Sequence, residues 1–265
     1  MHIFQKNYCH NISIIGAGNV GWHLAQALEA AGHIMHEIFS RNASHAQALA
    51  NKLHKVSPIS HLDFSKSKAK IFIIAVSDDA IGEVVSKLTL PPDALLVHTS
   101  GSQPMSSLTR GNTTHIGVFY PLQTFSKDKP IDFSSIPICL ETAHPKDLEL
   151  LQQLAGSISQ DVRVMNSEER VVLHVAAVFA CNFTNYLLGI AEKILDDHQI
   201  GLDVLQPLIT ETLQKALEIG PQKAQTGPAA RGDTATIQRH LEFLKNHEDY
   251  AKIYDLFSRH IAENT

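Results

Sequence analysis

The amino-acid sequence predicts an α/β domain followed by an all-α domain with a long central helix. In the first half of the chain, short apolar runs alternate with segments of helical periodicity, a pattern typical of βαβ units and a mostly parallel sheet. The first apolar run leads directly into a glycine-rich turn. After residue 165 the strand patterns stop and only helical patterns follow.

The elements of the first half are identified by apolar runs between turn residues and by apolar residues spaced i, i+3 and i+4. Strands are expected at residues 12–15, 34–39, 71–76, 95–98, 116–120, 136–140 and 162–165. Helices are expected at residues 20–31, 43–53, 79–88 and 145–155. These elements predict a first domain that spans residues 1–165.

A capping signal opens the second half. Asn166 lies three residues before Glu169, the arrangement of a capping box. From there to Asp196 the pattern predicts one helix of roughly eight turns, apolar on nearly every face up to Ile190. Further helices are expected at residues 202–219, 234–245 and 248–262, so residues 166–265 form the second predicted domain.

The long expected helix indicates a subunit interface. A helix that is hydrophobic all round must be covered on all sides, and residues 166–265 supply too few other elements to cover it. We therefore expect a homodimer that associates through the C-terminal helical domain.

The composition excludes several kinds of partner. The 265-residue chain has a net charge of −5, and no segment concentrates Lys or Arg, so neither nucleic acid nor a membrane surface is expected to bind. The three cysteines form no CxxC pair, which argues for a reducing compartment. The histidines form no HxxxH or HxH pattern, so no metal site is expected.

Neither a signal peptide nor a membrane span is expected. Residues 1–7 lack an apolar core and a cleavage site. The longest apolar stretch, residues 171–190, contains His174, Asn182 and Asn185, which favours a buried helix over a membrane span. We expect a soluble, cytoplasmic protein.

The strongest local signal is a GxGxxG turn between the first expected strand and the helix after it. Its members are Gly16, Ala17, Gly18, Asn19, Val20 and Gly21. In this context the glycines permit a tight turn, the approach of the backbone to a pyrophosphate, and close packing of helix and strand. The motif predicts a Rossmann-like dinucleotide-binding domain; a tight turn without a ligand is the alternative.

The end of the second strand indicates which dinucleotide binds. NAD-binding domains place an acid there, whereas NADP-binding domains supply a cation. Here the strand is followed by Ser40, Arg41 and Asn42, and the nearest acid, Glu37, lies within the strand. Because a guanidinium binds a phosphate in a bidentate manner, NADP is the predicted cofactor. The alternative is that Arg41 is a solvated surface residue.

Two further turns are expected at the ligand-binding edge, because doubly wound sheets bind ligands at the carboxyl ends of their strands. Val76, Ser77 and Asp78 follow one strand, and Ser100 follows the next. We expect the first three to contact the cofactor and Ser100 to lie near the reacting groups. A helix cap at Asp78 or Asp79 and a purely structural turn at Ser100 are the alternatives.

These motifs resemble the N-terminal domain of pyrroline-5-carboxylate reductases, deazaflavin-dependent NADP oxidoreductases and β-hydroxyacid dehydrogenases. Residues 119–125, His174 with Asn182 and Phe183, and residues 226–233 resemble one bacterial family more closely. That family pairs a Rossmann-like domain with a helical C-terminal domain of unknown function, and its members are assigned as NADP oxidoreductases. The resemblance covers nearly the whole chain and implies the fold, the cofactor and a redox reaction.

The chain departs from one of these relatives at a catalytic position. β-Hydroxyacid dehydrogenases carry a catalytic lysine one helical turn before an asparagine on the long helix. If Asn182 corresponds to that asparagine, the lysine position holds Val178, which cannot donate a proton. This departure puts hydroxyacid oxidation by the usual route in doubt.

His174 is the expected proton donor or acceptor, because an imidazole titrates near neutral pH. On an ideal helix, Asn182 lies about 80° round from His174 and about 12 Å along the axis. One of the two would then contact the substrate and the other the cofactor. Two hydrogen-bonded polar residues in helix packing are the alternative.

The loop at residues 226–233 is the expected substrate-binding loop. It resembles in position the loop with which pyrroline-5-carboxylate reductases hold a substrate carboxylate. Thr226 and Arg231 would bind such a carboxylate, with Asp233 beside them. A structural ion pair between Arg231 and Asp233 is the alternative.

Two functions fit the sequence. The first is an NADP-dependent oxidoreductase that transfers a hydride to or from a small imine, carbonyl or hydroxyacid, and we expect this substrate to bear a carboxylate. Its active site would lie in the cleft between the domains. The second is a non-catalytic NADP-binding sensor or partner protein, which the missing lysine keeps open.

Overall fold

The computed structural model describes residues 9–109 and 111–265. The chain divides into two compact units, Met1–Phe179 and Ala180–Thr265, which we call unit 1 and unit 2 and describe separately. This division falls within the long helix, and the domain boundary expected after residue 165 stays a prediction. The segment at residues 1–7, in which no signal peptide is expected, lies outside the described residues.

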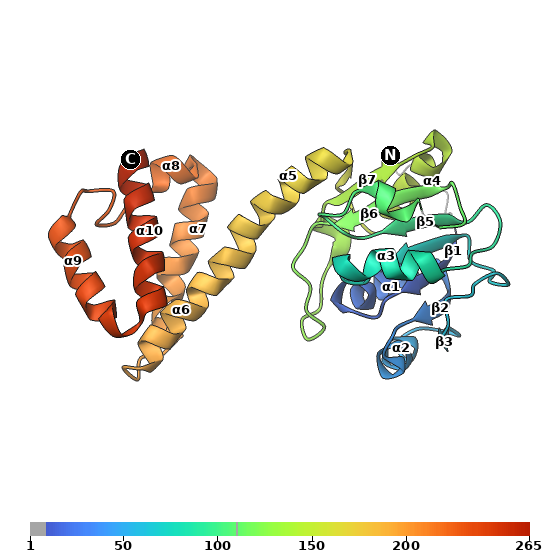
Figure 1. The fold of residues 1–265 in the computed structure, drawn as a ribbon, viewed down its shortest axis with the longest axis horizontal. Coiled ribbons are helices and arrows are strands. Elements are labelled where there is room, and N and C mark those ends of the chain that lie inside the picture. Colours follow the sequence, from blue (N-terminus) through green and yellow to red (C-terminus); the bar gives the residue numbers. More distant parts are fainter. Residues whose placement is uncertain (1–8, 110) are drawn as a thin grey trace, which may run out of the picture. The chain divides into compact units, whose positions relative to one another are not determined.

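The described part of unit 1 contains one eight-stranded sheet with the order β3-β2-β1-β4-β5-β6-β7-β8 (Figure 1). Its strands are β1 (Asn11–Ile15), β2 (Ile34–Phe39), β3 (Ser57–Ile59), β4 (Ile71–Ile74), β5 (Leu95–His98), β6 (Ile116–Pro121), β7 (Ile138–Thr142) and β8 (Val162–Val164). Only β6 and β7 pair antiparallel among these described strands. The predicted Rossmann-like, mostly parallel sheet is confirmed.

The sheet is apolar on both faces because helices cover both. Successive residues of β4 enter two different clusters: Ile71 and Ile73 pack in one, Phe72 and Ile74 in the other. This explains why the strand reads as an unbroken apolar run. The helices of this unit before the long helix are α1 (Asn19–Ala30), α2 (Ala43–Ala50), α3 (Asp78–Lys87) and α4 (Pro145–Gly156), with 3₁₀ turns η1 (Met105–Leu108) and η2 (Phe133–Ser135).

The long helix begins as predicted but is not one regular α-helix. Asn166 and Glu169 form the expected capping box, with two reciprocal hydrogen bonds of 2.9 Å. Helix α5 (Ser167–Ala177) then passes through a π-helical segment, η3 (Val178–Phe183), into α6 (Thr184–Asp196). In a π-helix each backbone N–H donates to the carbonyl oxygen five residues earlier, instead of four as in an α-helix. The ideal-helix angle expected between His174 and Asn182 is therefore wrong.

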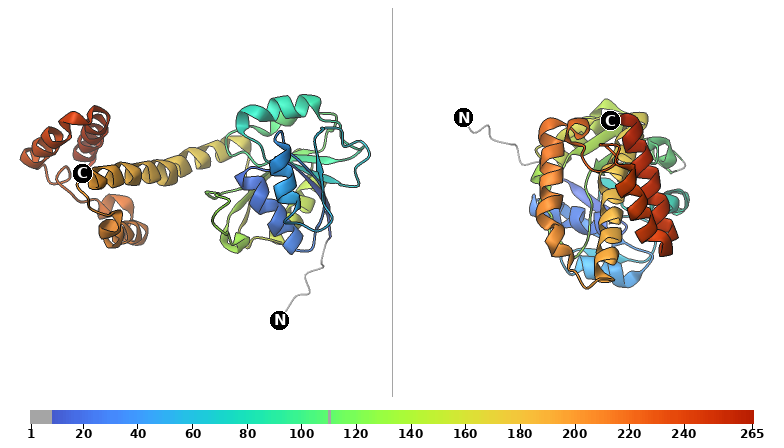
Figure 2. Two further views of the ribbon diagram at one scale, coloured as in Figure 1. Left: turned by 90° about the horizontal axis from the view of Figure 1, so that it is seen from below. Right: turned by 90° about the vertical axis from the view of Figure 1, so that its left-hand side faces the viewer.

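Unit 2 is helical throughout its described elements. After α6 come η4 (Leu202–Leu205), α7 (Gln206–Ile219), α8 (Pro221–Ala224), α9 (Thr234–Phe243), η5 (Leu244–Asn246) and α10 (Glu248–Asn264). Helices α7 and α10 lie on either side of α6 (Figure 2). Residues of α6 and α10 line an apolar groove of about 290 Å³. The predicted all-α C-terminal part is confirmed.

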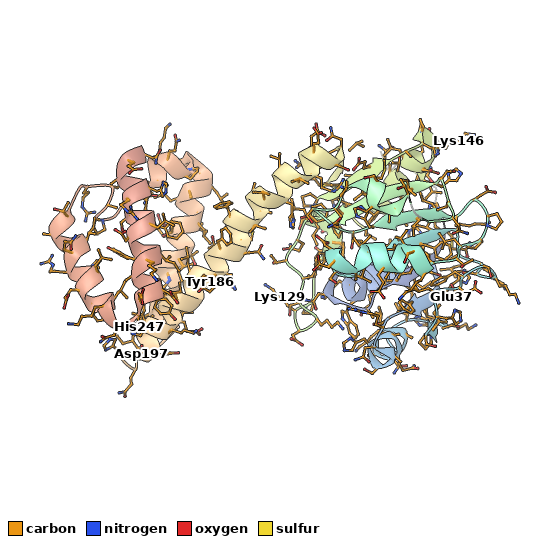
Figure 3. All side chains as sticks on the ribbon, in the orientation of Figure 1. Glu37, Lys129, Lys146, Tyr186, Asp197 and His247 are labelled. Carbon is orange, nitrogen blue, oxygen red and sulfur yellow. The ribbon has the colours of Figure 1, made fainter. Side chains whose placement is uncertain are left out.

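The apolar surface of the long helix is exposed in the single chain. The helix Ser167–Asp196 is long and apolar enough to cross a membrane by length and composition alone, and none of its most apolar 18-residue window is buried. Val172 is 71% exposed, and Tyr186 projects from α6 (Figure 3). The burial that the sequence predicts is therefore not provided by the described part of one chain.

Candidate active site

The glycine turn after β1 has no room for side chains at two of its positions. Gly16 has a φ of +119°, and a β-carbon there would lie 2.3 Å from the carbonyl oxygen of Ala75. A β-carbon on Gly21 would lie 2.0 Å from the carbonyl oxygen of Gly16. The turn is thus packed directly against the end of β4. This is the close approach that a dinucleotide-binding turn requires.

The N-terminus of α1 is open to a ligand. Its N-cap is Gly18, and no side chain caps the helix. Gly18 and Asn19 are exposed, whereas Ala17 is packed in the core, and the first turn contains no acidic residue. Uncapped amides at a helix N-terminus bind anions, so this turn fits a pyrophosphate.

The end of β2 presents Arg41 to solvent. Asn42 caps α2 by accepting from the backbone N–H of Ser44 at 3.0 Å. Arg41 is exposed and makes no hydrogen bond or ion pair with the other described residues. The Lys87 hydrogen bond is the largest cause that lowers the pKa of Glu83, and the charge of Arg41 adds weakly to it. The guanidinium is therefore available to a ligand at the strand end.

Glu37, the acid nearest to this strand end, is already engaged. Its carboxylate accepts hydrogen bonds from the hydroxyls of Ser13 and Ser67, the second at 2.7 Å. Glu37 lies within β2 of unit 1 (Figure 3). A carboxylate held by two serines inside the sheet is poorly placed to bind a ribose hydroxyl.

The turns after β4 and β5 are joined by a hydrogen bond. Ser77 occupies the N-cap of α3 without a side-chain cap bond, and Asp78 accepts from the hydroxyl of Ser102. The Ser100 hydroxyl oxygen accepts from the backbone N–H groups of Ser102 and Gln103, at 3.1 Å and 2.9 Å. Ser100 thus shapes this turn, Asp78 links the two turns, and a role of Ser100 near the reacting groups stays a prediction.

His98, the last residue of β5, is a buried neutral imidazole. Its Nδ1 accepts from the backbone N–H of Ser100 at 3.1 Å, and its Nε2 lies 3.4 Å from the carbonyl oxygen of Pro104. Burial, with a smaller contribution from the charge of Arg170, lowers the pKa of His98 to about 4. The ring therefore holds the turn in shape and is uncharged at neutral pH.

His174 meets this turn from α5. Its Nδ1 lies 3.1 Å from the phenol oxygen of Tyr120, at the carboxyl end of β6. A β-carbon on Gly101 would lie 2.5 Å from Nδ1 of His174 and 2.7 Å from the Tyr120 ring. The structure thus brings His174 to the Ser100–Gly101 turn, at the edge where the parallel strands have their carboxyl ends.

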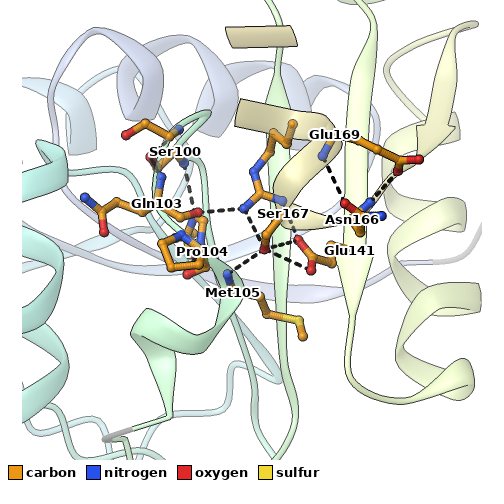
Figure 4. A network of polar contacts seen from close by, with 11 residues as sticks. Ser100, Gln103, Pro104, Met105, Glu141, Asn166, Ser167 and Glu169 are labelled. Atoms are coloured by element: carbon orange, nitrogen blue, oxygen red, sulfur yellow. Dashed lines mark hydrogen bonds and ion pairs between the residues drawn. The ribbon is translucent and has the colours of Figure 1, made fainter. Parts of the chain in front are cut away.

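A buried polar network fastens α5 to the same turn (Figure 4). The Arg170 guanidinium binds the carboxylate of Glu141 in β7 and donates to the Gln103 carbonyl oxygen at 2.6 Å. The Ser167 hydroxyl donates to Glu141 at 2.8 Å and accepts from the N–H of Met105 at 3.1 Å. The network fixes the first turn of α5, and with it His174, against the loop after β5.

The remaining predicted site residues belong to unit 2. Asn182 is exposed in η3. Asp233 caps α9 by accepting from the N–H of Thr236 at 3.0 Å, and the Thr236 hydrogen bonds lower the pKa of Asp233. The alternative ion pair between Arg231 and Asp233 is absent from the described residues, and Arg231 and Thr226 are exposed. Whether these residues join His174 in one site stays a prediction.

Comparisons with known proteins identify the family. Residues 5–115 match the model of a Rossmann-like domain, and residues 136–261 match a domain of unknown function, DUF2520. The structure of BF3122 from Bacteroides fragilis, assigned as an NADP oxidoreductase, has 38% sequence identity and a TM-score of 0.87. The match covers 96% of this chain and 98% of BF3122. The chain belongs to the BF3122 family. No curated protein matches it significantly.

More distant structures share the fold of the BF3122 family. TM1727 of Thermotoga maritima is 21% identical, with a TM-score of 0.68, over 96% of this chain and 97% of that one. A reductive aminase of Aspergillus terreus, in complex with NADPH and ethyl levulinate, is 14% identical. Its TM-score is 0.68, over 97% of this chain and 95% of that one. At these identities the likeness shows the fold alone.

Within the BF3122 family fold, this site contains three residues that the sequence did not single out. Tyr120 lies in the family motif at residues 119–125, and its place at the end of an expected strand is the signal that points to it. Arg170 and Glu141 gave no signal, because an isolated charge in a helix or strand usually faces solvent. Their pairing depends on tertiary contacts between residues 29 positions apart.

Proposed function

We propose that the protein is an NADP-dependent oxidoreductase that transfers a hydride to or from a small imine, carbonyl or hydroxyacid. The observation that carries this proposal is the glycine turn, whose packing against Ala75 leaves the N-terminus of α1 open to a pyrophosphate. The assignment of BF3122 as an NADP oxidoreductase supports the same reaction class.

The residues present fit NADP better than NAD. Arg41 is exposed beside the strand end and can bind a 2′-phosphate, whereas Glu37 is engaged by two serine hydroxyls. The turn at residues 16–21, the segment 40–42 and Val76, Ser77 and Asp78 are the residues proposed to hold the cofactor. When bound, NADPH supplies the hydride.

His174 is the proposed catalytic residue. Reduction of a C=O or C=N bond adds a hydride to carbon and a proton to oxygen or nitrogen, and an acid or base at that atom accelerates such reactions by roughly 10²–10⁴-fold. Asn182 is proposed to make the second polar contact, so that one of His174 and Asn182 contacts the substrate and the other the cofactor. Thr226 and Arg231, beside Asp233, are the proposed site of a substrate carboxylate, which a guanidinium binds well.

Turnover measurements test the function. NADPH consumption should be followed with a panel of small cyclic imines, ketones and keto acids. We expect turnover of at least one carboxylate-bearing compound, and His174→Gln should lower kcat about 100-fold while NADPH binding by calorimetry is unchanged. His54→Asn, at a side chain that is 94% exposed, is the control. Tight NADPH binding without turnover across the panel would favour the non-catalytic alternative.

We also propose that the protein is a cytoplasmic homodimer that associates through the long helix. On this helix Val172, Phe179 and Tyr186 are 71%, 65% and 58% exposed in the single chain, and large exposed apolar patches mark interaction surfaces. Obligate dimers bury more than about 2,000 Å². Light scattering at low micromolar concentration should give twice the 29.2 kDa chain mass. A 29.2 kDa particle, or one that needs detergent to stay in solution, would contradict this proposal.

A further inference from the structure

We infer that Tyr120 is a positioning residue that keeps a hydrogen on Nε2 of His174 in both charge states of the imidazole. Nε2 of His174 would then present a hydrogen-bond donor to the substrate. The inference rests on the proposed function only in taking His174 as the group that contacts the substrate. Its structural part concerns two side chains of unit 1 and can be tested without a substrate.

The two rings are held together by their surroundings. The phenol oxygen lies 3.1 Å from Nδ1, and the rings meet edge to face with centroids 6.0 Å apart. Gly101 leaves the space that both rings use, since any β-carbon there would collide with both. Tyr120 itself is buried and packs beside Cys139 and Val118. The pair is therefore a fixed contact and not a chance approach of mobile side chains.

The direction of the hydrogen bond follows from the chemistry of the phenol. Burial raises the pKa of Tyr120 to about 12, so the hydroxyl keeps its hydrogen at neutral pH. Among the described residues, Nδ1 of His174 is the acceptor within hydrogen-bond distance of that hydroxyl. When Tyr120 donates to Nδ1, the neutral imidazole must carry its own hydrogen on Nε2.

The same contact survives when the imidazole is charged. Both ring nitrogens then carry a hydrogen, and Nδ1 donates to the phenol oxygen, because a hydroxyl can accept as well as donate. A carboxylate in this place could only accept and would favour a hydrogen on Nδ1. Tyr120 thus leaves a hydrogen on Nε2 of the substrate-free imidazole in both charge states. When the charged ring gives that proton to the substrate, the remaining hydrogen is on Nδ1 and stays bonded to the phenol oxygen. A permanent donor suits the delivery of a hydrogen bond to a carbonyl oxygen that gains negative charge.

The charges around the pair allow this arrangement. Arg170, one turn earlier on α5, is bound by Glu141 of β7 and the Gln103 carbonyl. Asp78 of α3 is bound by Ser102. Cys139, also of β7, is a buried thiol whose pKa is raised by burial. No described carboxylate lies within ion-pair distance of His174, so none competes with Tyr120 for Nδ1.

Nitrogen NMR of the histidine side chains tests the inference on the substrate-free protein. At alkaline pH, where imidazoles are neutral, we expect the His174 signals to show a hydrogen on Nε2 and a hydrogen-bonded, bare Nδ1. His174→Gln identifies the signals by their loss. Tyr120→Phe should remove the hydrogen-bond signature from Nδ1. A hydrogen on Nδ1 in the unaltered protein would overturn the inference, even if Tyr120→Phe does not fold.

A second pair in the chain supplies a matched control. Nδ1 of His240 lies 2.7 Å from the hydroxyl of Tyr254 in unit 2, so Tyr254→Phe removes a bond of the same kind at another place. It should change the His240 signals and leave those of His174 as they are. Once a substrate is found, Tyr120→Phe should lower kcat about tenfold with little change in KM. If no substrate is found, the proposed function fails while the NMR result still decides the role of Tyr120.

Discussion

Arg170 of α5 and Glu141 of β7 form an ion pair inside unit 1, with side chains that are 1% and 15% exposed. The guanidinium also binds the carbonyl oxygen of Gln103, in the loop that follows Gly101. One buried cation therefore connects a helix, a strand and the loop of the candidate site. The position of His174 against Gly101 depends on this connection.

Arg170→Leu should be strongly destabilising, because it leaves the Glu141 carboxylate without its cation. Loss of one partner of a buried pair costs about 3–5 kcal/mol in the free energy of unfolding. Urea unfolding followed by circular dichroism measures this. Arg163→Leu is the matched control, since Arg163 pairs with Asp161 at the surface and surface pairs contribute little. Equal effects of the two substitutions would contradict the structural role of Arg170.

Gly101→Ala and Gly82→Ala should change stability in opposite directions. The alanine at position 101 would collide with His174 and Tyr120, and overpacking of this kind costs about 1–3 kcal/mol. Gly82 lies inside α3 with open space where the β-carbon would go, so alanine there should stabilise the helix by about 0.5–1 kcal/mol. Thermal unfolding of both variants is the measurement. A neutral Gly101→Ala would mean that the two rings are not held in place by the turn.

Arg41→Ala should weaken the preference for NADPH over NADH by about 1–3 kcal/mol, the scale of a lost charge-assisted hydrogen bond. Calorimetric titration of both cofactors gives the difference directly. Arg163→Ala removes an exposed arginine from the outer strand β8, on the far side of the sheet order from β2, and should leave the preference unchanged. Equal affinity of the unaltered protein for the two cofactors would refute the assignment of NADP.

Stability should fall as the pH drops from about 6.5 to about 4. Burial lowers the pKa of both His33 and His98 to about 4, below the value of 6.5 expected in the unfolded chain. In that pH window the unfolded chain binds protons that the folded chain does not. Each histidine therefore lowers the free energy of unfolding by up to about 3 kcal/mol. His98→Asn, which keeps an acceptor for Ser100, should flatten the decline in urea unfolding, and His54→Asn should not. A decline that is unchanged in His98→Asn would contradict this account.

The sequence predicted the elements whose patterns are local. Strands β2 and β5 have the expected bounds. Strand β5 opens with the unbroken apolar run of residues 95–97 and is buried along its whole length, as a strand covered on both faces should be. Strand β3 was missed, since three residues with Pro58 at their centre carry no strand signal. The π-helical segment was missed because an extra residue in a helical turn leaves no trace in apolar spacing.

The candidate site was predictable only where one segment supplies it. The glycine turn and the strand end at Arg41 could be found because a short motif encodes them. The contact between Tyr120 and His174 joins residues 54 positions apart, and nothing in either segment indicates the other. Turn residues and catalytic residues share the same composition, so the sequence alone does not separate the two roles of Ser100; the structure shows that its hydroxyl accepts two backbone hydrogen bonds of the turn.

The two outer strands of the sheet limit how this protein can self-associate. Strands β3 and β8 have three residues each, β3 contains Pro58, and β8 carries Arg163, which is paired with Asp161. Short edges with a proline or a charge resist the addition of a strand from another molecule. Sheet extension, the route by which many α/β proteins join end to end or aggregate, is thus closed at both edges of unit 1. At high concentration the protein should remain free of fibrous aggregates as long as the sheet itself stays folded.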